Sequence, residues 1–358
     1  MADFDYGNAR LRAMKSRLLA RRDLETLAEL GSMQGLISAL AKTAYQRSIE
    51  AALTHASGLE CIAQAIRMDL INTFGKARGF FRDDAGRMVA IVLRPYDLHN
   101  LKAILRGLSR NIPSAEILNV LLPVGDLHYA VLAELTRVAG PRVAIDLLAS
   151  MNEPIVQPLL KLRARRPGAD LPEMELALDQ WHFQEAWKYV QSAPSAREVL
   201  TSALKLEADI NNLLTVLRFA HEPEERRHLL ESGDAGGLVE LLVEPGFLPR
   251  PLLVHLGNQD SLEAAIELLA GTRYEPALRA GLQDFKKTGR LSEIERHLKR
   301  FRLGWLSSMI FKDPLGIGVF LGYLALKINE INNLRWIAHG VHLGLGVREI
   351  KAELEVAG

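Results

Sequence analysis

The sequence predicts an all-α protein composed of three similar helical domains. Two observations support this fold class: apolar residues follow helical spacing in almost every segment, and two short phrases each occur three times. The pattern typical of strands, in which apolar and polar residues alternate between turn signals, does not occur in the sequence.

The first phrase places an acid three residues before an asparagine that is followed by leucine. Its copies are Asp97-Leu98-His99-Asn100-Leu101, Asp209-Ile210-Asn211-Asn212-Leu213 and Glu330-Ile331-Asn332-Asn333-Leu334. The second phrase occupies residues 35–41, 143–149 and 264–270. Both recur at intervals of roughly 110 to 120 residues, which indicates one helical unit repeated three times. We therefore predict repeats at 1–124, 125–237 and 238–358, with approximate threefold pseudosymmetry around a central cavity.

Apolar periodicity and the breaks between periodic segments predict the helices of each repeat. In the first repeat they lie at 8–22, 24–29, 33–54, 59–73, 88–108 and 114–121, with breaks at Gly31 and Pro113. In the second they lie at 125–138, 141–149, 174–190 and 196–220, with breaks at Gly140-Pro141 and Pro167-Gly168. In the third they lie at 261–269, 291–301 and 316–339, the last following Asp313-Pro314. Pro95 lacks a backbone N–H, so we expect it to kink or interrupt helix 88–108.

The acid and the amide of the repeated phrase lie beside the apolar stripe of a helix. On a 3.6-residue helix, Asp97 and Asn100 fall next to the leucines and isoleucines, whereas His99 lies on the other side. Polar groups at a packing face need partners, so we expect hydrogen bonds to backbone groups or to a neighbouring helix end. The predicted structural repeat motif comprises Asp97, Asn100, Asp209, Asn212, Glu330 and Asn333.

Composition limits the possible functions. The chain has 358 residues, 48% hydrophobic and 24% charged, with a net charge of +1. This near-neutral balance disfavours a nucleic-acid partner, and the basic runs 161–166 and 296–302 are interpreted as solvated faces or contacts to an acidic protein. With Cys61 as its single cysteine, the chain cannot form an internal disulfide, which favours a cytoplasmic setting. The longest apolar stretch, 315–326, is well short of the roughly 20 residues of a membrane-spanning helix.

No motif in the sequence predicts a catalytic, cofactor or metal site. The nearest catalytic pair is Asp97 with His99, but adjacent helical residues point about 100° apart. Gly316-Ile317-Gly318 lacks the preceding strand and the Lys-Ser/Thr ending of a nucleotide loop, so we interpret it as a helix start. We expect no catalysis and no cofactor. Two alternatives stay open: a free-standing soluble helical enzyme and a generic helical scaffold.

Several segments resemble one known family. Residues 6–16, Tyr-Gly-Asn-Ala-Arg-Leu-Arg-Ala-Met-Lys-Ser, are similar to the N-terminus of the C subunit of prokaryotic V/A-type rotary ATPases, a relative of the d subunit of eukaryotic V-ATPases. Asp313-Pro314-Leu315-Gly316-Ile317-Gly318 and residues 329–335 resemble its C-terminal signature, and residues 97–101 and 176–179 resemble its interior phrases. The resemblance extends over the whole chain.

This resemblance implies a non-catalytic rotor adaptor of an ATPase or ATP synthase. A funnel of three helical domains would receive the D and F subunits of the central shaft and rest on the proteolipid (c/K) ring. Torque would then pass between ATP turnover and ion translocation. The resemblance implies a single copy of the chain within a larger complex, peripheral on the cytoplasmic face of the membrane.

Overall fold

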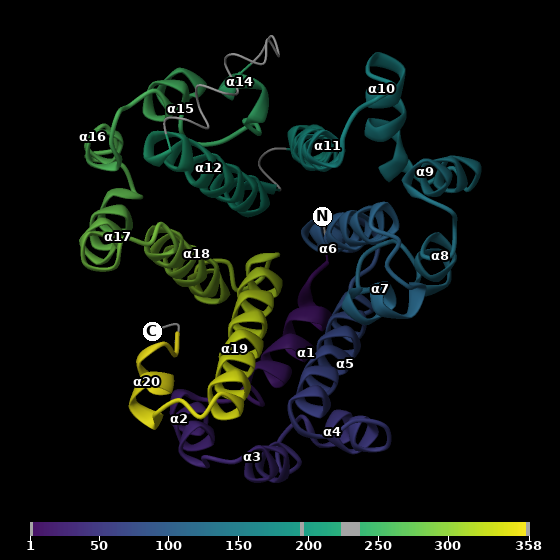
Figure 1. Cartoon of the computed structure of the whole chain (residues 1–358), viewed down its shortest axis with the longest axis vertical. Helices are drawn as coiled ribbons and strands as arrows, with labels where there is room; N and C mark the ends of the chain where they lie inside the picture. The colour runs from purple at the N-terminus through teal and green to yellow at the C-terminus, as the bar shows by residue number, and fades with distance from the viewer. Residues whose placement is uncertain (1–2, 194–196, 223–236, 356–358) are drawn as a thin grey trace. The chain divides into compact units, whose positions relative to one another are not determined.

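The computed structural model describes residues 3–193, 197–222 and 237–355, and these residues form an all-helical fold (Figure 1). They contain nineteen α-helices, one 3-10 helix and no strand, so the predicted all-α class is confirmed. The helices are α1 (Asp5–Lys15), α2 (Arg21–Glu29), α3 (Met33–Leu40), α4 (Gln46–Leu53), α5 (Gly58–Arg78), α6 (Asp83–Ser109), α7 (Ser114–Val120), α8 (Tyr129–Leu135), α9 (Pro141–Ser150), η1 (Pro154–Val156), α10 (Gln157–Arg165), α11 (Leu171–Gln191), α12 (Glu198–His221), α14 (Leu238–Leu241), α15 (Arg250–Gly257), α16 (Leu262–Glu267), α17 (Glu275–Thr288), α18 (Ser292–Lys312), α19 (Gly318–His342) and α20 (Val347–Ala352).

The chain forms two compact units. The first contains residues 1–99, 121–129 and 303–358, and the second contains residues 100–120 and 130–302. The first unit therefore joins both ends of the chain, whereas the second is built from its middle. The repeat boundaries near 124 and 237 remain predictions.

In the first unit, the N-terminal helix α1 packs on α19, which lies near the other end of the chain (Figure 1). The Asn8 side chain donates from Nδ2 to the carbonyl oxygen of Gly316 at 3.0 Å, and Arg12 donates to the carbonyl oxygen of Pro314 at 2.5 Å. The two signatures at opposite ends of the sequence therefore meet. The carboxylate of Asp313 accepts from Gly318 N–H at 2.8 Å at the start of α19, as expected for a helix start at this glycine pair.

In the second unit, the core lies where α11, α12 and the segment that precedes α15 meet. Phe183, Ala208 and Val243 form one buried cluster there. Asp170 caps α11 by accepting from Glu173 N–H, while the Glu173 carboxylate accepts from Asp170 N–H. This capping box fixes the start of the helix.

Three predicted helices differ from the structure for identifiable reasons. The predicted helix 125–138 forms only at Tyr129–Leu135, because backbone N–H groups before it bind the carboxylate of Asp97. Helix 33–54 breaks into α3 and α4 at a turn where Thr43 bonds to Leu40 and Tyr45. No interruption occurs at Pro95: α6 is continuous, and buried residues on both sides of the proline, such as Leu93 and Leu98, anchor it.

Other differences concern extent and boundaries. Helices α10, α14, α15, α17 and α20 were not predicted, and α18 continues beyond the predicted end at residue 301, to Lys312. The predicted start of helix 196–220 lies outside the described residues, in which α12 begins at Glu198. Among the described residues, no helix has the length and apolarity needed to cross a membrane.

Candidate functional site

The six residues of the repeated motif are all buried. Their exposed fractions lie between 0% and 4%: Asp97, Asn100, Asp209, Asn212, Glu330 and Asn333. A buried carboxylate or amide is costly unless it is hydrogen-bonded. The partners of each side chain therefore decide what the motif does.

Asp97 and Asp209 bind the backbone in the same way. The Asp97 carboxylate accepts from the N–H groups of Asp126 at 2.6 Å and Leu127 at 3.1 Å. The Asp209 carboxylate accepts from Phe247 at 3.0 Å and Leu248 at 3.1 Å. In both places, two consecutive N–H groups converge on one carboxylate that lies on the preceding long helix.

A glycine precedes the two donors in each case. A Cβ atom at Gly125 or Gly246 would overlap the carboxylate of Asp97 or Asp209, respectively. Glycine is required at these positions because the carboxylate fills the space that a side chain would take.

Glu330 has a richer set of partners in the first unit. It accepts from Leu19 N–H at 2.5 Å and from the Tyr45 hydroxyl at 2.6 Å. The Lys327 ammonium contacts Glu330 at 2.7 Å, Asp69 at 2.7 Å and the Tyr45 hydroxyl at 2.8 Å. Because buried ions are tolerated only when paired, this cluster is a set of mutually dependent charges.

A tyrosine also reaches Asp209. The hydroxyl of Tyr274 donates to the Asp209 carboxylate at 2.6 Å, as that of Tyr45 does to Glu330. Each tyrosine follows a copy of the second sequence phrase by a few residues, in Thr43-Ala44-Tyr45 and Thr272-Arg273-Tyr274. This recurrence was the signal that could have identified the tyrosines. Lys327 and Asp69 carried no comparable sequence signal.

The asparagines Asn212 and Asn333 each bind both backbone groups of a single residue. Asn212 donates to the carbonyl of Val243 at 2.8 Å and accepts from its N–H at 2.9 Å. Asn333 donates to the carbonyl of Glu355 at 2.6 Å and accepts from its N–H at 2.9 Å. The amide thus replaces the backbone partner that a strand or helix would provide.

Burial shifts the acid–base behaviour of the motif. Loss of solvent raises the pKa of Asp97 to about 6, against the lowering effect of the two backbone N–H groups. Burial likewise raises the pKa of Asp209, while the Tyr274 hydroxyl and backbone N–H groups act to lower it. Desolvation, followed by the charge of Glu330, holds the pKa of Tyr45 well above its ordinary value. The tyrosine therefore stays a neutral donor.

These contacts bear on the alternative enzymatic interpretation. Asp97 is buried and bonded to the backbone, while His99 is exposed on the other side of α6. The structure therefore does not bring this pair together. Within the described ranges, no group of three or more His, Cys, Asp or Glu side chains is arranged to hold a metal ion.

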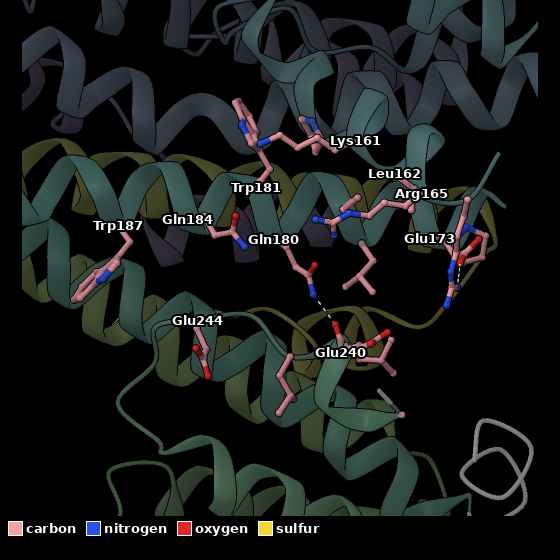
Figure 2. Close-up of a pocket in the computed structure, with 18 of the residues that line it drawn as sticks. Lys161, Leu162, Arg165, Glu173, Gln180, Trp181, Gln184, Trp187, Glu240 and Glu244 are labelled. Carbon is pink, nitrogen blue, oxygen red and sulfur yellow. Dashed lines mark hydrogen bonds and ion pairs between the residues drawn. The ribbon is translucent and has the colours of Figure 1, made fainter. Parts of the chain in front are cut away.

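The second unit contains a cavity of about 1160 Å³ between α10 and α11 and the segment around α14 (Figure 2). The Gln180 side chain crosses it to donate to the carbonyl of Glu240 at 2.5 Å. Lys161 and Arg165, from the first basic run of the sequence, line one wall. In the second basic run, Arg302 pairs with Glu207 at 2.9 Å and Lys299 with Glu295 at 2.5 Å.

Comparison with known proteins identifies the class to which this helical fold belongs. The family described as "ATP synthase (C/AC39) subunit" matches residues 7–353, nearly the whole chain. The chain belongs to this family. The resemblance noted in its terminal signatures is thereby confirmed.

Relatives match over most of their own length. The C subunit of the A-type ATP synthase of Methanosarcina acetivorans is 27% identical, with 99% of this chain and 93% of the relative covered. The C subunit of the A-type ATP synthase of Pyrococcus horikoshii is 25% identical, with 94% and 85% covered. The C subunit of the V-type ATP synthase of Deinococcus radiodurans is 25% identical, with 99% and 91% covered.

Proposed function

We propose that this chain is the non-catalytic rotor adaptor of an A/V-type ATP synthase. It links the D and F subunits of the central shaft to the proteolipid (c/K) ring and transmits torque between ATP turnover and ion translocation. The observation that carries this proposal is the family match over residues 7–353, together with relatives named as C subunits of ATP synthases. In this role the chain is a single copy on the cytoplasmic face of the membrane, held there by the ring.

Three repeats around a central cavity form the proposed socket. If the boundaries lie near 124 and 237, each motif acid binds the repeat that follows it. Asp97 of the first repeat accepts from Asp126 and Leu127 of the second, and Asp209 of the second accepts from Phe247 and Leu248 of the third. Glu330 of the third accepts from Leu19 and Tyr45 of the first. This cyclic order supports a closed, threefold pseudosymmetric arrangement.

A torque-transmitting adaptor needs rigidity more than reactive groups. The motif carboxylates provide it through contacts that are buried and bonded to backbone, where each broken bond costs about 1–3 kcal/mol. This use of the carboxylates favours the adaptor over a soluble enzyme, because groups occupied in this way are not free to bind a substrate. A generic scaffold would share the rigidity but not the family match.

Assembly of the synthase without this chain tests the proposal. ATP hydrolysis by the catalytic head should persist, while ATP-driven ion pumping into vesicles should fall to the level of protein-free vesicles. Adding back the purified chain should restore pumping, which controls for damage during assembly. Pumping at the level of the intact complex in the absence of the chain would reject the adaptor role.

A further inference from the structure

The cavity of the second unit has properties that the buried motif does not explain. We call it the α10–α11 groove; its walls are α10 and α11 on one side and residues 237–250 on the other (Figure 2). An α-helix about 10 Å across rises 1.5 Å per residue, so the groove volume of about 1160 Å³ corresponds to roughly ten helical residues. This volume corresponds to two to three turns of a partner helix, which would take the place of the Gln180 side chain that now bridges the groove to Glu240 (Figure 2).

Two cations of α10 line this groove without an acidic partner. Lys161 and Arg165 are exposed, and neither forms an ion pair with a described residue. Their neighbours on the same segment are neutralised: Arg163 pairs with Asp146 at 2.7 Å and Arg166 pairs with Glu173 at 2.5 Å. Because Lys161 and Arg165 are four residues apart, they share one face of the helix, where like charges repel. An anionic partner would remove that cost.

Apolar and aromatic side chains line the same groove. Leu162 and Leu176 line the groove, as do Trp181 and Trp187 of α11. Both tryptophans are partly exposed, and Figure 2 shows them at separate positions along α11. Large aromatic side chains and arginine are the residue types that most often anchor protein interfaces.

The opposite wall carries two acids and one arginine, which leaves it with a net negative charge. Glu240 and Glu244 line it, and Glu244 lies 3.7 Å from Arg250 in a half-exposed pair. A ligand that is negative all round, such as a polyphosphate, would meet these acids. A helix with acids on one face only would place them toward α10 and away from this wall. The polarity of the groove thus favours an amphipathic protein helix over a free polyanion.

We infer that the α10–α11 groove binds an amphipathic helix of another subunit of the same complex, with Asp or Glu facing Lys161 and Arg165 and apolar side chains on Trp187 and Leu176. This inference rests on the proposed function only in placing the chain within a multisubunit complex. It adds a binding surface and the chemistry of its partner. The binding mode is that of a helix seated in a groove through one apolar face.

Zero-length cross-linking of the purified complex tests the inference. A carbodiimide joins a lysine amine to a carboxylate only when the two are in contact, and mass spectrometry then identifies both peptides. We expect Lys161 to be joined to Asp or Glu in a helical segment of another subunit that has apolar residues at helical spacing. Lys42, which is also exposed and without an ion pair among the described residues, is the control lysine. Lys161→Arg should abolish the cross-link and leave the complex intact.

A second measurement uses charge removal. The double variant Lys161→Gln/Arg165→Gln should bind the rest of the complex about 2- to 30-fold more weakly, as expected for the loss of two exposed ion pairs. The matched control, Lys42→Gln/Arg47→Gln, removes the same charge from exposed positions of α4 and the turn before it and should leave affinity unchanged.

Three results would overturn the inference. One is the absence of a cross-link from Lys161, or cross-links only to its own chain. Another is equal affinity of the double variant and its control. The third is binding of inorganic polyphosphate that depends on Lys161 and Arg165 without any carboxylate cross-link. None of these results affects the outcome of the pumping experiment, so the adaptor proposal is tested independently of the groove.

Discussion

Gly246→Ala should destabilise the protein through a single clash with the motif carboxylate. A Cβ atom at this position would lie 2.0 Å from Oδ1 of Asp209 and 3.1 Å from its Cγ. Since carbon and oxygen pack at about 3.5 Å, the carboxylate or the loop would have to move by more than about 1 Å. That movement stretches the bonds from Phe247 N–H, Leu248 N–H and the Tyr274 hydroxyl, which are now 3.0, 3.1 and 2.6 Å long.

The magnitude follows from the bonds that are lost. A hydrogen bond to a charged group contributes about 1.5–3 kcal/mol, so losing two of the three should lower the free energy of unfolding by about 3–6 kcal/mol. A unit of 150–250 residues, such as the second one, loses about 2–4 °C per kcal/mol, so its melting temperature should fall by about 6–24 °C. Urea unfolding and calorimetry measure both quantities. Gly168→Ala is the matched control, because a Cβ there meets no atom within 4 Å.

A double-mutant cycle separates the clash from a general effect of the substitution. Asp209→Ala removes the carboxylate and leaves room for the new methyl group, so Gly246→Ala should cost little in that background. The double variant should therefore lose less free energy of unfolding than the sum of the two single variants, by at least about 1 kcal/mol. Additive losses, or a Gly246→Ala variant as stable as Gly168→Ala, would show that no such clash with the Asp209 carboxylate occurs.

Two further predictions concern the other motif residues. Asn212→Leu should lower the free energy of unfolding by about 1–3 kcal/mol, because it leaves both backbone groups of Val243 buried and unpaired. The control is Asn211→Leu, since the Asn211 side chain is exposed. Equal stability of the two variants would contradict the expectation. The pKa of Asp97 rises from 3.8 to about 6 on folding, so the folded state binds the proton more tightly. The stability that this group contributes is at most about 3 kcal/mol at low pH, and it is lost as the pH rises from below about 4 to above about 6. Asp97→Asn lacks this pH-dependent contribution. In urea unfolding, the free energy of unfolding of the variant should therefore lie further below that of the wild type at pH 4.5 than at pH 7. A difference between the two proteins that does not change with pH would contradict this expectation.

The sequence predicted the buried motif better than its surroundings. Helical periodicity placed Asp97 and Asn100 beside the apolar stripe and indicated backbone partners, because a polar group at a packing face has few other options. It could not identify which backbone groups were bound. Those groups lie on residues such as Val243 and Leu248, whose side chains carry no signal for a hydrogen bond formed by their main chain.

Predictions from local sequence were also wrong where a contact with a distant residue determined the backbone conformation. The segment from Gly125 has the composition of a helix start, but the N–H groups of Asp126 and Leu127 bind Asp97, so the helix begins only at Tyr129. Pro95 likewise does not interrupt its helix. An interior proline costs a helix about 3 kcal/mol or more, and this 27-residue helix is held by buried residues on both sides of the proline.

The contacts of Glu330 impose an order on biosynthesis. Asp97 and Asp209 find their partners 29 to 65 residues further along the chain, so these contacts can form soon after each segment is made. Leu19 and Tyr45 must wait for a residue 311 and 285 positions later. At about 5–20 residues per second, the first helices of the nascent chain are without their final partner for roughly 15–60 s. During that interval their apolar surfaces are exposed to solvent and to chaperones, and the helix that covers them is among the last to be synthesised.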